Sequence, residues 1–90
     1  MNNTRRKAIN NVAKNIETVT SMIEEIMSKI EDIVEEENEA VENIPDNFQD
    51  SFDYESSEAA LQALDDVSED LTDVLQSLES ASSWIQDALF

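Results

Sequence analysis

Carboxylates are the residues of this sequence best able to do chemistry, because Asp and Glu account for 22 of its 90 residues. Paired carboxylates can serve as general acid and base, and clustered ones can bind calcium through their oxygens. The acidic stretch 46–58 lacks the glycine and the alternating ligand spacing of an EF-hand loop. The whole sequence also lacks histidine, cysteine and glycine, and with them the usual general base, thiolate ligands and Gly-rich phosphate loops. We therefore predict a protein that is not an enzyme and that holds no metal or cofactor.

The charges are distributed very unevenly along the chain. All five cations lie within the first 29 residues, at Arg5, Arg6, Lys7, Lys14 and Lys29. Residues 30–90 contain 19 carboxylates and no cation. Such a surface repels nucleic acid and anionic membranes and attracts basic protein surfaces. A merely solvated helix face normally intersperses lysines among its acids, so the cation-free stretch indicates that the negative field itself has a function.

A regular 3–4 spacing of apolar residues predicts the elements that carry these carboxylates. With Ile9 as heptad position a, positions a and d are apolar over five heptads except at Glu37. The pattern predicts a long helix over about residues 4–43, with Asn3 or Thr4 as its N-cap. Position e adds the apolar residues Ala13, Met27, Val34 and Val41. The apolar stripe is therefore wider than the seam of a two-stranded pair.

Pro45 is expected to end this helix, because it has no amide hydrogen and disfavours helical geometry at Ile44. A connector over about residues 44–56 follows. Its three aromatic residues are expected to fold back over the end of the hairpin; they are Phe48, Phe52 and Tyr54.

A second heptad run, with Ser57 at position a, predicts a helix over about residues 57–89. Asp53, Ser56 and Ser57 are its candidate N-caps. The two helices match in length and the connector is short, which predicts antiparallel neighbours. Antiparallel pairing also sets the basic start of the first helix beside the negative end of the second helix, and so relieves an unfavourable charge–dipole contact.

The chain is therefore expected to be one all-α domain, residues 1–90, folded as an antiparallel two-helix coiled-coil hairpin. A domain this small is marginally stable, and two helices bury only one face each. The extra apolar residues at position e therefore predict a homodimer that forms a four-helix bundle. Core and dimer contacts are expected at Ile16, Ile23, Ile30, Leu64, Leu71, Leu78 and Trp84. Packing against a different protein is the main alternative.

Two residues in this pattern have alternative interpretations. Glu37 occupies a core position, where it either extends to water near the end of the hairpin or fixes register and oligomeric state. Trp84 lies at position g, beside the apolar stripe. It is either a contact at the edge of the core or the dimer, or an aromatic anchor for a partner.

The outward carboxylates form columns at positions b and c that repeat every two turns, or about every 10 Å. One helix offers about one carboxylate per 5 Å, so a four-helix dimer approaches the DNA spacing of roughly one charge per 1.7 Å. We expect the partner-binding face at Glu31, Asp32, Glu35, Glu36, Glu39, Asp65, Asp66, Glu69, Asp70 and Asp73. This surface is predicted to mimic DNA and to bind a basic protein, with no direct contact to nucleic acid or membrane.

Several segments occur in a distinctive order: the basic start at residues 5–7, the acidic run at 35–40, the Asn-Ile-Pro break at 43–45 and the acidic entry to the second helix at 54–58. This order resembles a group of small acidic proteins encoded by phages and mobile elements of Gram-positive bacteria. The resemblance implies a phage accessory protein and supplies no catalytic residues. In that setting small acidic proteins often inhibit host defence.

The sequence thus predicts a non-catalytic, phage-type inhibitor of a basic host defence or nucleic-acid-binding protein. The alternative is a structural or assembly module that pairs with partner helices, with the acidity serving solubility. Residues 5–7 resemble the basic start of a signal peptide, but no apolar run follows them. No stretch approaches the roughly 18 to 20 apolar residues that span a bilayer, so we expect a cytoplasmic location.

Overall fold

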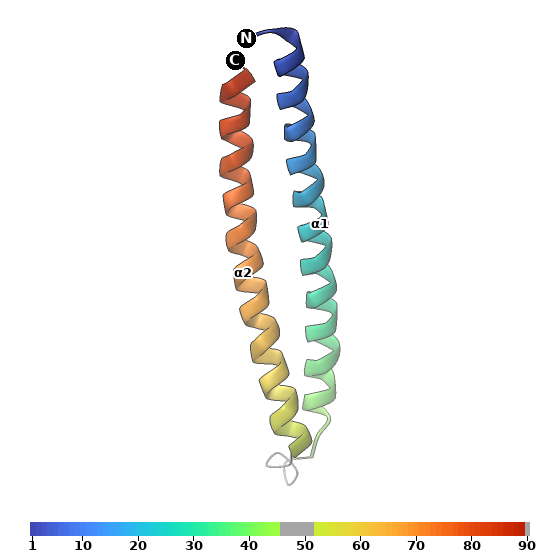
Figure 1. The fold of residues 1–90 in the computed structure, drawn as a ribbon. Coiled ribbons are helices and arrows are strands. Elements are labelled where there is room, and N and C mark those ends of the chain that lie inside the picture. The colour runs from blue at the N-terminus through green and yellow to red at the C-terminus, as the bar shows by residue number, and fades with distance from the viewer. Residues whose placement is uncertain (46–51, 90) are drawn as a thin grey trace. The chain divides into compact units, whose positions relative to one another are not determined.

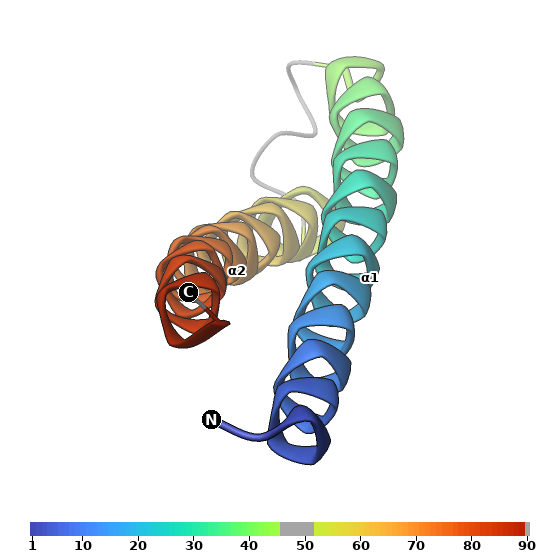
Figure 2. The ribbon, with the colours of Figure 1, turned by 90° about the horizontal axis from the view of Figure 1, so that it is seen from above.

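The computed structural model describes residues 1–45 and 52–89, which form two helices and no strand (Figure 1). Helix α1 spans Asn3–Glu42 and helix α2 spans Phe52–Leu89. Both helices are labelled in Figure 2. The first half of α1 contacts the second half of α2, and the second half of α1 contacts the first half of α2. The fold is therefore all-α, an antiparallel two-helix hairpin, as the heptad runs predict.

The start of α1 is capped one residue earlier than the sequence predicts. The side-chain oxygen Oδ1 of Asn2 accepts a hydrogen bond from the Arg5 amide at 2.9 Å, and the Asn2 carbonyl accepts one from Arg6. Asn3 and Thr4, the predicted caps, lie inside the helix. Asn2 and Asn3 are the same residue type and equally suited to the N-cap, so residue preference alone does not distinguish them.

Helix α1 ends in a tightened turn just before the proline. The Ile44 amide donates a hydrogen bond to the Val41 carbonyl, three residues back, at 3.0 Å. Pro45 follows, and its ring prevents the helix from continuing. The break therefore has the physical cause that the sequence predicts.

Helix α2 begins at Phe52, about five residues earlier than the sequence predicts. Asp53, Ser56 and Ser57, the three predicted caps, accordingly lie within the helix. An acidic residue near a helix N-terminus interacts favourably with the helix dipole, so Glu55 favours the earlier start. Tyr54 lies on the helix and is half-buried. Phe48 falls outside the described residues, and the Phe52 side chain is not described.

The seam between the helices uses heptad positions a and e, not a and d. In α1, all residues at a and e from Ile9 to Ile44 are buried or half-buried, whereas all those at d are exposed. In α2, every residue at a and e from Ser57 to Leu89 is half-buried, and at d only Ala81 is not exposed. The d positions therefore do not form the hairpin core, which corrects the expectation from the 3–4 spacing.

The side-chain types at the two positions explain this choice. In α2, position e carries three leucines and two serines, while position d carries only alanine and valine. Position e of α1 carries mostly small or flexible residues, such as Ala13, Thr20 and Met27, whereas positions a and e of α2 are rich in leucine. Large side chains opposite small ones interdigitate well, which favours this seam. The Thr20 hydroxyl is satisfied within its own helix, since it donates to the Ile16 carbonyl at 2.9 Å.

The contacts divide the hairpin into two compact units. Residues Met1–Glu25 and Leu71–Phe90 form the first, which we call the terminal unit, and Ile26–Asp70 form the second, the connector unit. The core of each unit is small. Among the described residues, only Ala13 in the terminal unit and Ile30 in the connector unit are buried, each at 9% exposure.

We predict that Asn2→Ala lowers the free energy of unfolding by about 1 kcal/mol, because the Arg5 amide loses its acceptor. Asn3→Ala is the matched control, since Asn3 is exposed and lies inside the helix. Urea denaturation followed by circular dichroism measures both variants. A larger loss of stability for the control than for Asn2→Ala would show that the cap is assigned incorrectly.

Candidate acidic interface

The a and e seam leaves each helix with two different exposed sides. Positions b and f lie on one flank of the seam, positions d and g lie on the other, and c points directly away from the partner helix. The helices run antiparallel, so the d and g positions of both fall on the same side of a unit. The b and f positions share the opposite side. Each unit therefore has two unlike faces.

The first of these is the acidic side, which we define as positions b, c and f. Between residues 9 and 44 and between 57 and 89, it holds 15 of the 18 carboxylates. Position a holds Glu37, and the only other two carboxylates of these ranges, Glu36 and Asp70, are at position g. The acidic residues are thus segregated by helix geometry, and this segregation exists in both units.

The second is the outer apolar face, which we define as positions d and g. No d position in the two heptad runs carries a charge. Eight of its large apolar side chains are more than 40% exposed: Val12, Val19, Met22, Ile26, Ile33, Val67, Val74 and Trp84. The most exposed of them is Trp84, at 73%.

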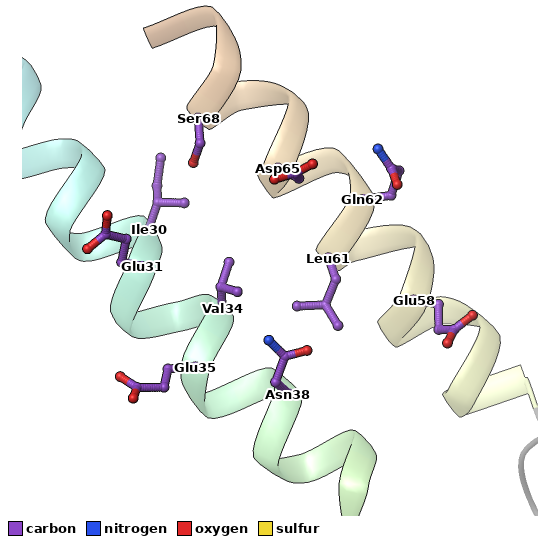
Figure 3. A pocket seen from close by; sticks show the side chains of 10 residues that line it. All are labelled: Ile30, Glu31, Val34, Glu35, Asn38, Glu58, Leu61, Gln62, Asp65 and Ser68. Carbon is purple, nitrogen blue, oxygen red and sulfur yellow. The ribbon is translucent and has the colours of Figure 1, made fainter. Parts of the chain in front are cut away.

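The acidic side of the connector unit contains a groove of about 830 Å³. Ile30 and Val34 project from α1 toward α2, and Leu61 projects back toward α1, so the floor is apolar (Figure 3). The rim carries carboxylates from both helices, namely Glu31, Glu35, Glu58 and Asp65. The carboxylates of Glu31 and Glu35 point away from α2, as expected if like charges repel each other across the rim.

The acidic side of the terminal unit contains a second groove, of about 560 Å³. Its floor is formed by Ile16, Leu75 and Leu78, and its rim carries the carboxylates of Glu17, Glu24 and Glu79. Hydroxyl and amide side chains occupy the remaining positions of this rim, including Ser21 and Gln76. Both grooves thus have an apolar floor and a polar rim, but the rim of the first carries four carboxylates and that of the second carries three.

The two units differ strongly in net charge. The terminal unit contains four cations and six carboxylates, which gives −2, while the connector unit contains one cation and 16 carboxylates, which gives −15. The basic residues 5–7 share the terminal unit with Asp87, as the antiparallel arrangement predicts. Almost the whole negative field therefore belongs to the connector unit.

The ten predicted partner-binding carboxylates are all exposed, and they fall into two groups. Eight lie on the acidic side: Glu31, Asp32, Glu35, Glu39, Asp65, Asp66, Glu69 and Asp73. Glu36 and Asp70, at position g, instead lie on the outer apolar face. Sequence reasoning left Glu58 out of this set, although it shares position b with Asp65 and lines the groove. The floor of the groove was also missed, because position e was not recognised as part of the seam.

The predicted core residues Ile16, Ile23, Leu64, Leu71 and Leu78 lie half-buried in the seam, and Ile30 is buried there. Trp84 lies outside positions a and e of the seam, and the single chain leaves it largely exposed. Glu37 is half-buried within the seam.

Across residues 1–45 and 52–89, carboxylates nowhere gather in threes in an arrangement that could hold a metal ion. Within the same ranges, neither helix has a window apolar enough to cross a membrane. The chemistry available on the acidic side is electrostatic attraction and hydrogen-bond acceptance.

One phenol lies beside the groove rim. A side-chain hydrogen bond to Glu58 raises the pKa of Tyr54, and burial and the negative charge of Glu58 act in the same direction. The hydroxyl donates and the carboxylate accepts. This bond connects the first turn of α2 to a rim carboxylate of the groove.

Comparison with protein-family models, with curated proteins and with solved structures finds no match to this chain.

We predict that Tyr54 titrates above its ordinary pKa of about 10 and that Glu58→Ala returns the midpoint toward that value. Tyr54 is the only tyrosine, so ultraviolet absorbance follows it alone. Because the pKa is raised in the folded state, the stabilisation is fully present below pH 10 and is lost as the pH rises through the folded pKa. Glu55→Ala removes an equal charge nearby and is the control; an equal fall of the pKa in both variants would contradict the hydrogen bond.

Proposed function

We propose that this protein is a non-catalytic inhibitor that binds a basic surface of another protein through the acidic side of its connector unit. The observation that supports it best is the concentration of 16 carboxylates against one cation in that unit. The basic surface is one that otherwise binds nucleic acid, because closely spaced carboxylates on helices resemble the phosphates of a duplex. A phage accessory protein directed against a host defence protein fits this activity.

The charge density requires a function because it destabilises the fold. Like charges within a few ångströms repel, and a net charge of −15 on one unit opposes its compaction. Solubility alone needs a far smaller net charge. Complementary charge instead raises the association rate with a basic partner and suppresses binding to acidic ones.

The groove suits arginine and lysine side chains in particular. Their aliphatic stems can lie on apolar surface while the charged groups remain among carboxylates at the edge. The floor of Ile30, Val34 and Leu61 provides the apolar surface, and the four rim carboxylates provide the acceptors. Arginine can also pair with a carboxylate through two parallel hydrogen bonds. A basic helix or loop is therefore the expected ligand.

The second candidate is an assembly module that pairs with helices of another protein. It is favoured by the outer apolar face, since an exposed apolar surface of this kind marks an interaction site. In this case the carboxylates would serve solubility, and the partner would bind on the side away from the groove. The two candidates therefore place the partner on opposite faces.

Neutralising the four rim carboxylates tests the first candidate. We expect the variant with Glu31→Gln, Glu35→Gln, Glu58→Gln and Asp65→Asn to bind its basic partner roughly fivefold or more weakly, from the loss of several exposed ion pairs. The assay is displacement of labelled duplex DNA from a panel of purified basic DNA-binding proteins, repeated at rising salt concentration. Circular dichroism checks that helicity is retained.

The matched control removes the same charge from the acidic side of the terminal unit, through Glu17→Gln, Glu24→Gln, Glu79→Gln and Asp87→Asn. We expect it to retain most of the displacement activity. If no panel member releases DNA at low salt, the inhibitor proposal fails. The alternative result is DNA displacement that is unchanged by salt and by the rim variant, yet is lost when the outer apolar face is altered. That result would favour the assembly module.

A further inference from the structure

The outer apolar face is the largest feature that the acidic interface does not use. Its d positions are all apolar, as are Met22, Ala63 and Trp84 at position g, and the seam leaves all of these except Ala81 exposed. The apolar residues at position e, from which the sequence predicts a dimer, lie within the hairpin seam. That reason for a dimer no longer holds, and the exposed residues at d and g replace it.

We propose that a second copy of this chain covers the outer apolar face and that the two hairpins pair antiparallel. The terminal unit of each copy then lies on the connector unit of the other. The two-fold axis crosses the helices near the midpoint of α1, and α1 of one copy packs on α1 of its partner.

The solvent-exposed area of the chain is large enough for a second copy to cover part of it. The chain exposes 6931 Å², whereas a globular monomer of 10.2 kDa exposes about 5300 Å². A standard protein interface removes about 800 Å² from each partner, and homodimer interfaces often remove more. The excess is therefore large enough to accommodate a stable dimer interface. Among the described residues no side chain is fully buried, so a single hairpin has little core of its own.

The charge pattern selects this face for a strongly acidic partner such as a second copy. The d positions carry no charge, and the g positions of the two heptad runs carry only Lys29, Glu36 and Asp70. Contact through any other exposed side would bring columns of carboxylates together at short range. Two copies can approach through the outer apolar face while the acidic sides remain in water.

The charge difference between the units selects the antiparallel orientation. A parallel dimer would set two connector units, each of net charge −15, against each other. The antiparallel dimer sets each of them against a unit of net charge −2, and the products of the facing charges, summed over both pairs of units, fall roughly fourfold. It also brings the basic residues 5–7 to the acidic end of the partner's α1.

The interface is tested by placing carboxylates on it. Val19 and Ile26 are 43% and 45% exposed in the single hairpin, so Val19→Glu with Ile26→Glu leaves the seam intact. In the dimer the new carboxylates face one another without a partner, and we expect the dimer Kd to rise roughly a thousandfold or more. The control, Thr18→Glu with Ser28→Glu, adds the same charge to the acidic side.

Sedimentation equilibrium with circular dichroism reads out the result. We expect the unmodified chain and the control at twice 10.2 kDa, and the interface variant at 10.2 kDa with its helicity retained. An unmodified chain that is monomeric and fully helical would overturn the proposal and leave the face for a different protein. An interface variant that remains a dimer would also overturn it.

Orientation is measured separately with spin labels on single cysteines, since the chain has no cysteine of its own. Asn11→Cys and Glu25→Cys both lie at the outward position c. In the antiparallel dimer the two labels at residue 11 are offset by about 35 Å along the helices, and those at residue 25 by less than about 10 Å. We expect a clearly longer distance at residue 11; equal distances at both sites would show a parallel dimer.

Discussion

Repulsion between carboxylates is the constraint on which the rest of this structure depends. A chain with 22 acidic and five basic residues can fold only if its acids avoid one another and avoid the seam. Two long helices satisfy this requirement, because a heptad repeat separates the seam from positions that point to water. The few carboxylates outside positions b, c and f show how strict the separation is. Glu37 is the single charged residue at a seam position of the two heptad runs, and it stays half-buried.

The fold could be predicted from sequence because its main determinants are local. Apolar spacing and Pro45 predict two helices and the break between them, and both are present. The seam was predicted less well, because d and e both hold apolar residues in α1. The signal that separates them is in α2, where leucines recur at a and e while d holds alanine and valine. Leucine at e marks the buried side, and Val67 and Val74 at d are correspondingly exposed.

The candidate site was partly predictable for the same reason. Position b identified the carboxylates of Glu31 and Asp65, but the groove between them depends on which residues form its floor. That floor depends on the seam, which is a property of how two helices meet and not of either helix alone. The early start of α2 was not predicted either, since the stabilising effect of Glu55 at a helix N-terminus is small beside a clear heptad start. The identity of the ligand cannot be predicted from the helix pattern, because a carboxylate column attracts any complementary basic surface.

The two proposed interfaces are compatible because they lie on opposite sides of each unit. A second copy on the outer apolar face leaves positions b and f uncovered, so dimerisation does not compete with a basic partner. Dimerisation instead increases the capacity to bind basic partners, because one dimer presents two acidic sides. In an antiparallel dimer the two connector units lie apart, each beside a terminal unit of low net charge, and each keeps its own groove. The assembly would then bind two basic surfaces at two separate places. A partner that is itself two-fold symmetric, with nucleic-acid-binding surfaces at matching separation, would gain affinity from engaging both at once.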